Sequence, residues 1–403
     1  MTAFWDSLFS TAARGIRPSP IRDMLQSCRK PGMISFAGGM PDPAIFPVDQ
    51  FADAASILKT EGRDILQYGA TEGYAPLKEF LSSWCAPRLG RTVDSEEMLI
   101  TSGSIQGADL MTLATVNPGE YVITEAPTFL GVTTDMYNHG AKFLCVPCDS
   151  EGMMVDRLPA MIEQARHEGK VVKFVYTIAT FQNPLGVTMA LERRKALVRS
   201  AREYGVAIFE DDPYGYVRFD GEHLPTLFSL DGGEHVIYAG SFSKILAPGT
   251  RVGWCCGSRD LIRKMVVFKQ GIDTCTSVVA QAIVYRYAKL GCLDAFLPKI
   301  IAHYKAKRDV MIEAFDTFLP KGEFRYTKPE GGFFFWLETP NIAMDALFDR
   351  AIARNVAVVK GKPFYPNADG GDHHCRVCYT FASADDIREG VRRFGDAMRE
   401  LLP

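Results

Sequence analysis

The segment Gly240-Ser241-Phe242-Ser243-Lys244 contains residue types that could provide a reactive amine beside an anion-binding group. A lysine just after an apolar strand is most often a surface charge. Lys244 has two hydroxyl groups beside it and Arg251 seven positions further on. It is therefore also a candidate for a partly buried amine whose pKa is lowered by burial and by the neighbouring cation.

Three carboxylates follow the preceding apolar strand, in the segment Glu210-Asp211-Asp212-Pro213-Tyr214. Acidic residues that follow a buried strand are uncommon unless a cation or a metal ion compensates their charge. Pro213 and Gly215 are equally typical of a solvated turn. The sequence leaves three interpretations open: a solvated turn, a carboxylate directed at a protonated heterocycle, and a divalent-metal site.

Three further strand ends contain residues that suit a flat, anionic ligand. Ser102–Gly107 is a Gly/Ser-rich turn before a helix, and the free N–H groups and positive dipole of a helix N-terminus favour an anion. Phe129 could stack on a ring, although core packing is the commoner role of a lone phenylalanine. Asn183 precedes Pro184, a pattern that first of all indicates a turn, and its amide is a hydrogen-bond donor.

These residues would be positioned by apolar strands that alternate with helical segments between about residues 50 and 290. Such alternation predicts a mainly parallel sheet that helices cover on both faces. Ligands then bind beyond the carboxyl ends of the strands, where the polar residues above are found. One helix is expected at Leu191–Tyr204, with Thr188 as its capping signal. The predicted strands are Met98–Thr101, Tyr121–Thr124, Lys142–Val146, Val172–Tyr176, Val206–Glu210, Val236–Ala239 and Val252–Cys256.

The last part of the chain has a different order of elements. A long helical run around Leu297–Phe318 precedes short strands near Phe333–Leu337, Ala357–Val359 and Arg376–Thr380, and a final helix begins at Ala384. This mixture predicts a second, smaller α/β domain. Since no flexible linker, repeat or low-complexity tract is present, we expect the two domains to be tightly joined.

The composition excludes several classes of protein. Of the 403 residues, 47% are hydrophobic and 23% are charged, which excludes a disordered chain. The formal net charge of −3 gives no basic field for nucleic acid or an anionic membrane, so neither is expected as a partner. No apolar run approaches the ~18–20 residues of a membrane span.

Ten cysteines are scattered along the chain, which favours a reduced cytosol over a disulfide framework. The pairs Cys145/Cys148 and Cys375/Cys378 have the spacing of zinc ligands. Each pair lies in strand-like sequence, where residues i and i+3 face opposite sides, so we expect core cysteines and no metal. The arginine-bearing segment 1–22 faintly resembles an organelle presequence, but a cytoplasmic protein remains the expectation.

In combination these motifs resemble the aspartate-aminotransferase-fold family of pyridoxal-phosphate enzymes. The motifs that carry the resemblance are Thr101–Gly107, Asn183–Gly186, Asp211–Tyr214, and Ser241–Lys244 with Arg251. Within the family the chain is similar to the kynurenine/α-aminoadipate aminotransferase branch, whose markers are Pro18–Arg22, Gly38–Pro41, Leu66–Tyr68 and Glu210–Tyr214. The resemblance extends from about Arg17 to the C-terminus.

The resemblance implies an α/β fold in two parts. We expect a large domain with a mainly parallel seven-stranded sheet between helices. A smaller α/β domain is expected to be built from the N-terminal arm and the C-terminal part. The expected boundaries are 1–48 for the arm and part of the small domain, 49–292 for the large cofactor-binding domain, and 293–403 for the C-terminal small domain.

The resemblance also implies catalytic roles around pyridoxal 5′-phosphate. Lys244 would form the Schiff base (internal aldimine) with the cofactor and then act as the base that moves the α-proton. Asp211 would keep the pyridinium nitrogen protonated. Asn183 and Tyr214 would bind the ring's 3-oxygen, and Phe129 would stack on the ring, where the family often has tyrosine.

The cofactor phosphate would be bound by residues near two strand ends. The expected phosphate contacts are Ser104, Gln106, Ser241, Ser243 and Arg251. Ile105 stands where this branch commonly has glutamine, so only its backbone N–H could contribute. Tyr68 would reach the phosphate of the neighbouring subunit, which implies a homodimer.

The substrate would be an amino acid whose α-carboxylate is held by Arg376 as a bidentate fork; a surface arginine on an edge strand is the alternative. By resemblance, Asn183 would also contact substrate. The expected side-chain pocket consists of Ile21, Arg22, Gly39, Tyr68 and Phe334. Arg22 would suit an acidic substrate side chain, whereas the aromatic run Phe333–Trp336 would suit an aromatic or bulky one.

The resemblance therefore implies an enzyme that transfers an amino group from an α-amino acid to a 2-oxo acid. A lyase or a β/γ-replacement enzyme with the same site remains the closest alternative. Ser241-Phe242-Ser243-Lys244 also matches the S-x-x-K element of penicillin-recognising hydrolases, but the S-D-N and K-T-G elements are missing. A non-catalytic sensor behind a DNA-binding domain is not expected, since too few residues precede Pro18.

Overall fold

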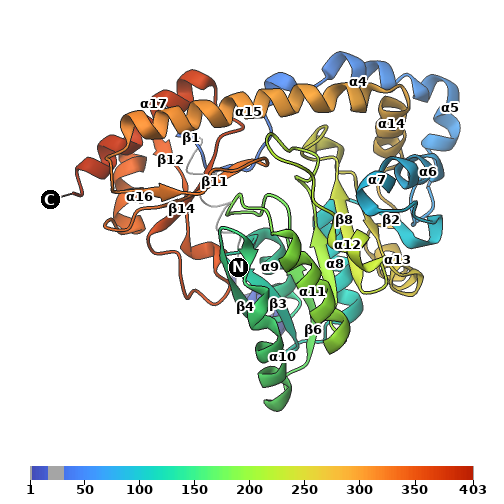
Figure 1. The fold of residues 1–403 in the computed structure, drawn as a ribbon. Coiled ribbons are helices and arrows are strands. Elements are labelled where there is room, and N and C mark those ends of the chain that lie inside the picture. The colour runs from blue at the N-terminus through green and yellow to red at the C-terminus, as the bar shows by residue number, and fades with distance from the viewer. Residues whose placement is uncertain (1, 17–30, 403) are drawn as a thin grey trace.

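The computed structural model describes residues 2–16 and 31–402, and its centre is an eight-stranded sheet in the order β2-β9-β8-β7-β6-β3-β4-β5 (Figure 1). All seven predicted strands are present: Met98–Thr101 matches at both ends, and the others have ends shifted by at most three residues. The predicted number of seven strands is nevertheless wrong. The chain reverses after β4 and forms an eighth strand, β5, whose two residues are too few to show a strand pattern in the sequence. The strands are β2 (Met98–Thr101), β3 (Tyr121–Ala126), β4 (Lys142–Asp149), β5 (Gly152–Met153), β6 (Val172–Thr177), β7 (Ala207–Asp211), β8 (Val236–Ser241) and β9 (Gly253–Cys256).

The middle of this sheet is parallel, as predicted. Strands β4, β3, β6, β7 and β8 are parallel neighbours, whereas β9 is antiparallel to both β8 and β2. The register pairs Thr177 with Glu210 and Asp211 with Ala239. The ends of β6, β7 and β8 therefore meet at one edge of the sheet, which brings the residues after them together.

Helices connect the strands of the large sheet and cover it. Helix α11 is found where predicted, but its N-cap is Ala190 without a side-chain hydrogen bond. The predicted cap, Thr188, instead has a buried hydroxyl without a hydrogen-bond partner. The connecting helices are α8 (Ser104–Thr115), α9 (Leu130–Asn138), α10 (Leu158–His167), α11 (Leu191–Tyr204) and α12 (Leu227–Asp231).

A second, smaller sheet has the order β10-β11-β14-β13 and is antiparallel throughout. Helix α15 (Cys292–Phe318) runs along the top of the molecule from the large-sheet part to this smaller part (Figure 1). The elements of the smaller part are β10 (Arg325–Tyr326), β11 (Phe334–Glu338), α16 (Met344–Ala353), β12 (Val356–Ala357), β13 (Val359–Lys360), β14 (His374–Cys378) and α17 (Ala384–Arg399). A smaller sheet domain was thus correctly predicted.

The N-terminal part contributes to both sides of the molecule. Strand β1 (Ile34–Ser35) pairs in parallel with β12, so the arm joins the smaller part. The helices that precede or follow the large sheet are α1 (Thr2–Leu8), α2 (Thr11–Gly15), α4 (Val48–Ala54), α5 (Ile57–Ile65), α6 (Ala75–Trp84), α7 (Ala86–Leu89), α13 (Arg259–Asp273) and α14 (Val278–Lys289). Within the described ranges, no helix combines the length and apolarity required to cross a membrane.

Aromatic side chains pack the two sheets against each other. Tyr214, which follows β7, has its ring centroid 5.4 Å from Phe333 and 5.8 Å from Phe334 at the start of β11. Tyr304 of α15 approaches Phe333 to 5.0 Å. These rings are buried, and each buried phenylalanine contributes on the order of 1.5–3 kcal/mol. Phe333 and Phe334 therefore contribute to the packing between the two sheets.

Candidate active site

A cavity of about 330 Å³ lies where the carboxyl edge of the large sheet faces β11 and β14. It collects residues from eight segments that are far apart in the sequence. The predicted residues that line it are Gly39, Ser104, Ile105, Phe129, Asn183, Asp211, Tyr214, Ser241, Ser243, Lys244, Arg251, Phe334 and Arg376. The lining residues that sequence reasoning missed are Gly131, Ile178, Pro213 and Pro248.

Lys244 places its amine in this cavity. Its Nζ donates a hydrogen bond to the Gly39 carbonyl at 2.8 Å and lies 5.5 Å from the ring centroid of Phe333. Loss of solvation lowers the pKa of Lys244 to about 8. The cations of Arg376 and Arg251 contribute to this lowered value, whereas Cys378 and Asp211 oppose the shift. A minor but usable fraction of such an amine is uncharged near neutral pH.

Asp211 presents an unpartnered carboxylate oxygen in a buried position. The residue is 2% exposed, and its Oδ2 accepts a hydrogen bond from Tyr176 Oη at 2.9 Å. Its Oδ1 is buried without a hydrogen-bond partner. Burial raises the pKa of Asp211 to about 7, while the hydrogen bond from Tyr176 and the nearby Ser104 hydroxyl oppose that rise. A buried acceptor without a donor is costly, so Oδ1 is suited to a ligand that brings a donor or a positive charge.

Arg376 and Asn183 form a buried hydrogen-bonded pair on the opposite side of the cavity. Arg376 Nη1 donates to Asn183 Oδ1 at 2.9 Å, and Nη2 donates to the Ala37 carbonyl at 2.8 Å. Because the Asn183 carbonyl oxygen is occupied, its amide NH₂ is left to donate to a ligand. The Arg376 guanidinium lies 4.3 Å from the ring centroid of Phe334 and is 1% exposed, so it is not a surface arginine. Its Nε is buried without a partner.

A cluster of donors lies at the end of the cavity formed by β8 and α8. Ser241 Oγ donates to Ser243 Oγ at 3.0 Å, and Arg251 Nη1 lies 3.4 Å from Ser243 Oγ. Arg251 Nη2 donates to the Ser102 carbonyl at 2.9 Å. Ser104 begins α8, so the first N–H groups of that helix point toward this end without partners four residues earlier. The cluster has the charge and the donors that bind a phosphate.

Gln106 is not among the residues that line the cavity, although we predicted a phosphate contact for it. Its side-chain oxygen accepts from Ser102 N at 2.8 Å and from Lys269 Nζ at 3.0 Å, and its side-chain nitrogen donates to Asp273 Oδ2 at 2.8 Å. Its own backbone N–H donates to the Gly103 carbonyl at 3.2 Å. Sequence reasoning could not foresee this, because two of the three partners of the amide, Lys269 and Asp273, are on α13.

Three predicted residues lie elsewhere or outside the described chain. Tyr68 is 83% exposed and does not line the cavity. Ile21 and Arg22 lie outside the described residues, as do the neighbouring family markers from Pro18.

Phe129 lines the cavity at the start of α9, and its ring would collide with a side chain at Gly131, where a Cβ would lie 2.5 Å from Phe129 Cζ.

The other two carboxylates beside Asp211 point away from the cavity. Asp212 is paired with Arg88 at 2.6 Å and accepts from Tyr238 Oη at 2.9 Å. Glu210 accepts from the backbone N–H groups of Leu227 and Phe228. The three acids therefore do not converge on one point, and the solvated-turn interpretation is also wrong because all three are buried.

Within residues 2–16 and 31–402, one group of three side chains has metal-ligand spacing: Asp109, Asp135 and His139, on α8 and at the end of α9. This group contains no residue of the cavity and no cysteine. Cys375 and Cys378 are buried, Cys145 and Cys148 are half-buried, and all four are free thiols.

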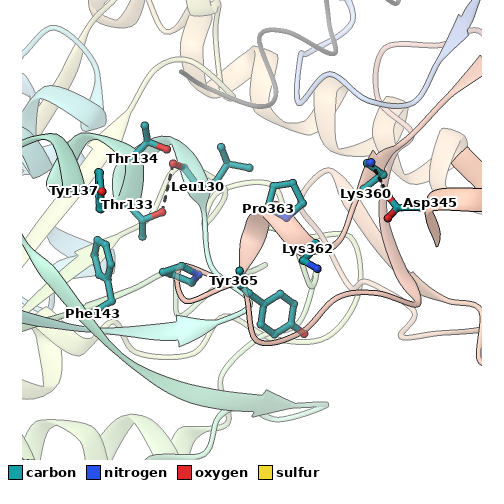
Figure 2. A pocket seen from close by; sticks show the side chains of 12 residues that line it. Leu130, Thr133, Thr134, Tyr137, Phe143, Asp345, Lys360, Lys362, Pro363 and Tyr365 are labelled. Carbon is teal, nitrogen blue, oxygen red and sulfur yellow. Dashed lines mark hydrogen bonds and ion pairs between the residues drawn. The ribbon is translucent and has the colours of Figure 1, made fainter. Parts of the chain in front are cut away.

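A second cavity, of about 380 Å³, lies between α9 and the segment that follows β13 (Figure 2). Leu130 lines it, directly after Phe129, so the two cavities lie on either side of the start of α9. Its two lysines already have acidic partners: Lys360 is 2.7 Å from Asp345, and Lys362 is 3.3 Å from Asp372. It holds no predicted site residue, and we assign the chemistry to the cavity of Lys244.

The residues of the first cavity fit pyridoxal phosphate. They offer an amine of lowered pKa, a buried carboxylate oxygen without a partner, and a separate cluster of hydroxyl, N–H and guanidinium donors. These three features match the cofactor's aldehyde, its ring nitrogen and its phosphate. Tyr176, which orients Asp211, was missed, although its place near the end of β6 was a usable signal.

Comparison with known proteins shows one family model that matches the chain, and relatives and solved structures that are similar to it. A family model described as aminotransferase class I and II matches residues 34–394. The chain is 39% identical to aromatic-amino-acid aminotransferase 1 of Thermococcus litoralis, over 100% of this chain and 96% of that protein. It is also 39% identical to 2-aminoadipate transaminase of Thermus thermophilus, over 99% and 98%. The crystal structure of Pyrococcus horikoshii kynurenine aminotransferase in complex with PMP matches with a TM-score of 0.95 and 40% identity, over 100% of both chains.

Proposed function

Since the chain belongs to the class I and II aminotransferase family, we propose that Lys244 is the residue that bonds to pyridoxal phosphate and moves the substrate's α-proton. The observation that carries this proposal is the amine itself. It lies in the same cavity as the unpartnered Asp211 oxygen, and its pKa is lowered to about 8. A base with a pKa near the working pH is both available and strong enough to accept a proton.

The protein is an enzyme that transfers amino groups, with amino acids and 2-oxo acids as its substrates and pyridoxal phosphate as its cofactor. When bound, this cofactor supplies an electron-withdrawing ring that makes the α-hydrogen of an attached amino acid acidic. Protein residues must therefore hold the ring, keep its nitrogen protonated and present a base to the α-carbon.

Asp211 is proposed to keep the ring nitrogen protonated. Its Oδ1 has no other partner, and the pyridinium N–H would remove the cost of leaving that oxygen buried and unpaired. Tyr176 holds the other oxygen, so the carboxylate is already oriented before the cofactor arrives. Asn183 and Tyr214 would donate to the ring's 3-oxygen, and Phe129 would pack on one face of the ring.

The donor cluster of Ser104, Ile105, Ser241, Ser243 and Arg251 is proposed to bind the phosphate. Ile105 would contribute only its backbone N–H. Charge-assisted hydrogen bonds of this kind are worth about 1.5–3 kcal/mol each, so a few of them would hold the cofactor tightly. Gln106 would support the cluster from behind and would not touch the phosphate.

Arg376 is proposed to bind the α-carboxylate of the substrate. A guanidinium has five N–H donors, and only two of its hydrogen bonds are made within the described chain. The donors that remain, including the buried Nε, suit a bidentate carboxylate. The substrate side chain would then lie toward Gly39 and Phe334, with Arg22 and Ile21 completing the pocket. The relatives act on aromatic amino acids, 2-aminoadipate and kynurenine, according to their names, and we propose a substrate of this aromatic or acidic class.

We also propose a homodimer in which Tyr68 completes the neighbouring site. The support is the exposure of a group of apolar side chains at the end of α5 and on α13. These residues are Leu66 (73%), Tyr68 (83%), Val267 (66%), Phe268 (42%) and Ile272 (52%). Large apolar side chains exposed on these elements are the kind of surface that a subunit interface would cover. We also propose two domains. The smaller consists of residues 1–48 and 293–403, which the pairing of β1 with β12 joins, and the larger consists of residues 49–292. A cytoplasmic location remains part of the proposal.

The decisive experiment mixes the purified enzyme with one amino acid and no 2-oxo acid. Transamination predicts stoichiometric release of one 2-oxo acid and conversion of the cofactor to its amine form, read by its visible absorbance. Release of ammonia or a side-chain fragment while the absorbance is unchanged would show elimination or replacement instead.

A further inference from the structure

Behind the proposed phosphate-binding end lies a buried lysine that touches no ligand. Lys269 of α13 is 0% exposed. Its Nζ donates to both carboxylate oxygens of Asp273 at 2.7 Å and to Gln106 Oε1 at 3.0 Å. A buried ammonium group is costly unless it is paired and hydrogen-bonded. Burial lowers the pKa of Lys269, and Asp273 opposes that shift.

Lys269 and Asp273 together determine how the Gln106 amide is oriented. An ammonium group only donates and a carboxylate only accepts hydrogen bonds. The Gln106 oxygen must therefore face Lys269, and its nitrogen must face Asp273, 2.8 Å away. With this orientation the same oxygen accepts the backbone N–H of Ser102 at 2.8 Å. The reversed amide would place two donors against each other at both Lys269 and Ser102.

Ser102 in turn positions Arg251, the arginine that lines the cavity. Its hydroxyl lies 3.3 Å from Thr276 Oγ1, and its carbonyl accepts from Arg251 Nη2 at 2.9 Å. Arg251 packs directly over Gly103, where a Cβ atom would overlap the Arg251 guanidinium. The guanidinium therefore has little freedom once the backbone of Ser102 is fixed. Helices α8 and α13, which carry this network, pack against each other beside the large sheet (Figure 1).

We propose that Lys269 is a positioning residue for cofactor binding: through Gln106 it fixes Ser102, and through Ser102 it holds Arg251 where the phosphate binds. The inference rests on the proposed function, since it takes Arg251 as a phosphate ligand. It goes beyond that proposal because it gives a buried residue of another helix a role specific to the phosphate, with none toward the ring.

The test compares two ligands that differ only in the phosphate. Apo-enzyme is titrated with pyridoxal 5′-phosphate and with pyridoxal, and binding is read from the visible absorbance. Lys269→Met has a similar length but no donors. It should weaken pyridoxal phosphate about tenfold, which is the expected effect of misplacing one charge-assisted contact, while pyridoxal affinity stays within about twofold. Lys264→Met, an exposed lysine of the same helix, is the control and should change neither affinity.

A second variant tests whether Lys269 acts through Gln106. Gln106→Leu should show the same phosphate-specific loss, and Lys269→Met/Gln106→Leu should bind pyridoxal phosphate no more weakly than Gln106→Leu alone. Additive losses would mean that Lys269 acts by another route. If circular dichroism shows that Lys269→Met does not fold, Lys269→Met/Asp273→Leu, which also removes the half-buried carboxylate that Lys269 pairs with, replaces it with the same expected loss.

Equal losses for both ligands, or no loss for either, would overturn the role of Lys269 in phosphate binding. The proposed function fails in a different way: the unaltered enzyme would then bind neither ligand at Lys244, as shown by borohydride reduction and peptide mass analysis. The two failures are therefore distinguishable in one set of titrations.

Discussion

The environment of Asp211 explains how a carboxylate can remain buried beside a lysine without forming an ion pair inside the protein. Tyr176 satisfies one oxygen and leaves the other free. The adjacent Asp212 has its own partners, Arg88 and Tyr238, on the other side of the strand. Asp211 therefore faces the cavity, whereas the adjacent Asp212 is bonded to residues of the core.

Tyr176→Phe should shift the pH dependence of catalysis. The tyrosine donor stabilises the charged form of Asp211 and so lowers its pKa; without that donor the pKa rises above about 7. More of the carboxyl is then protonated at a given pH. The acid limb of kcat/KM against pH should move upward by about 0.5–1 pH unit. Tyr238→Phe, which removes the donor of Asp212 instead, is the matched control, and a shift as large in that variant would contradict the assignment.

At the scale of elements, seven strands of the large sheet and the helices α8, α11, α15 and α17 could be predicted because their apolar runs alternate with turn residues. Contacts between elements could not. In the sequence, Gln106 and Asp212 look equally available to a ligand. In the structure, Gln106 accepts a hydrogen bond from Lys269, 163 residues away in the sequence, and Asp212 accepts one from Arg88, 124 residues away. Motif positions such as Lys244, Asp211 and Asn183 were predictable because each lies at the carboxyl end of a strand or within a few residues of it, and parallel strands bring such positions to one edge.

The turn between β2 and α8 should tolerate no side chain. Gly103 has φ +86° and its Cβ would overlap the Arg251 guanidinium, whereas Gly119 has φ +94° and open space around it. Both alanine variants should lose about 1 kcal/mol or more of stability from the left-handed backbone. Only Gly103→Ala should also weaken pyridoxal phosphate, by about tenfold, in an absorbance titration. Similar cofactor affinity in both variants would mean that Arg251 is not held by this turn.

Glu125 joins the end of β3 to the loop after β6, and its ionisation should affect stability. It accepts from Thr177 Oγ1, Ile178 N and Gln182 Nε2, and burial raises its pKa to about 7. The unfolded chain ionises near 4.5, so between these pH values the folded state binds more protons. The contribution of Glu125 to the stability of the apo-enzyme therefore falls as pH rises from 4.5 to 7.

Glu125→Gln cannot ionise and should escape this loss. Relative to the unaltered protein, it should gain about 1–3 kcal/mol as pH rises from 4.5 to 7 and keep that gain above 7. Urea unfolding at several pH values measures the difference. The exposed Glu222→Gln should show no such trend, and a gain for Glu125→Gln that does not vary with pH would refute the ionisation argument.

At the scale of the whole molecule, the cavity forms only where the two sheets face each other. The large sheet supplies Lys244 and Asp211, the smaller one supplies Arg376 and Phe334, and the segment before α4 supplies Gly39. The described residues of one chain form this cavity, and Tyr68 of the same chain does not line it. The exposed position of Tyr68 is understandable if a second copy of the chain uses it.

Subunit mixing tests that arrangement. Lys244→Ala lacks the amine, and Tyr68→Ala lacks the residue proposed to cross over. If Tyr68 serves the neighbouring subunit, a mixed dimer has one intact site, so equal mixing after unfolding and refolding should restore about one quarter of the wild-type activity. If Tyr68 serves its own subunit, mixing should restore nothing, and a monomer in sedimentation analysis would exclude the dimer directly.

The covalent attachment of pyridoxal phosphate to Lys244 is the most direct test of the account. The holoenzyme is reduced with borohydride, digested and analysed by mass spectrometry, with Lys244→Ala treated in parallel. We expect the reduced cofactor on the peptide that contains Lys244, no labelled peptide in the variant, and a fall in turnover of at least about a thousandfold in that variant. A label on another lysine, or turnover near the wild-type value in Lys244→Ala, would contradict it.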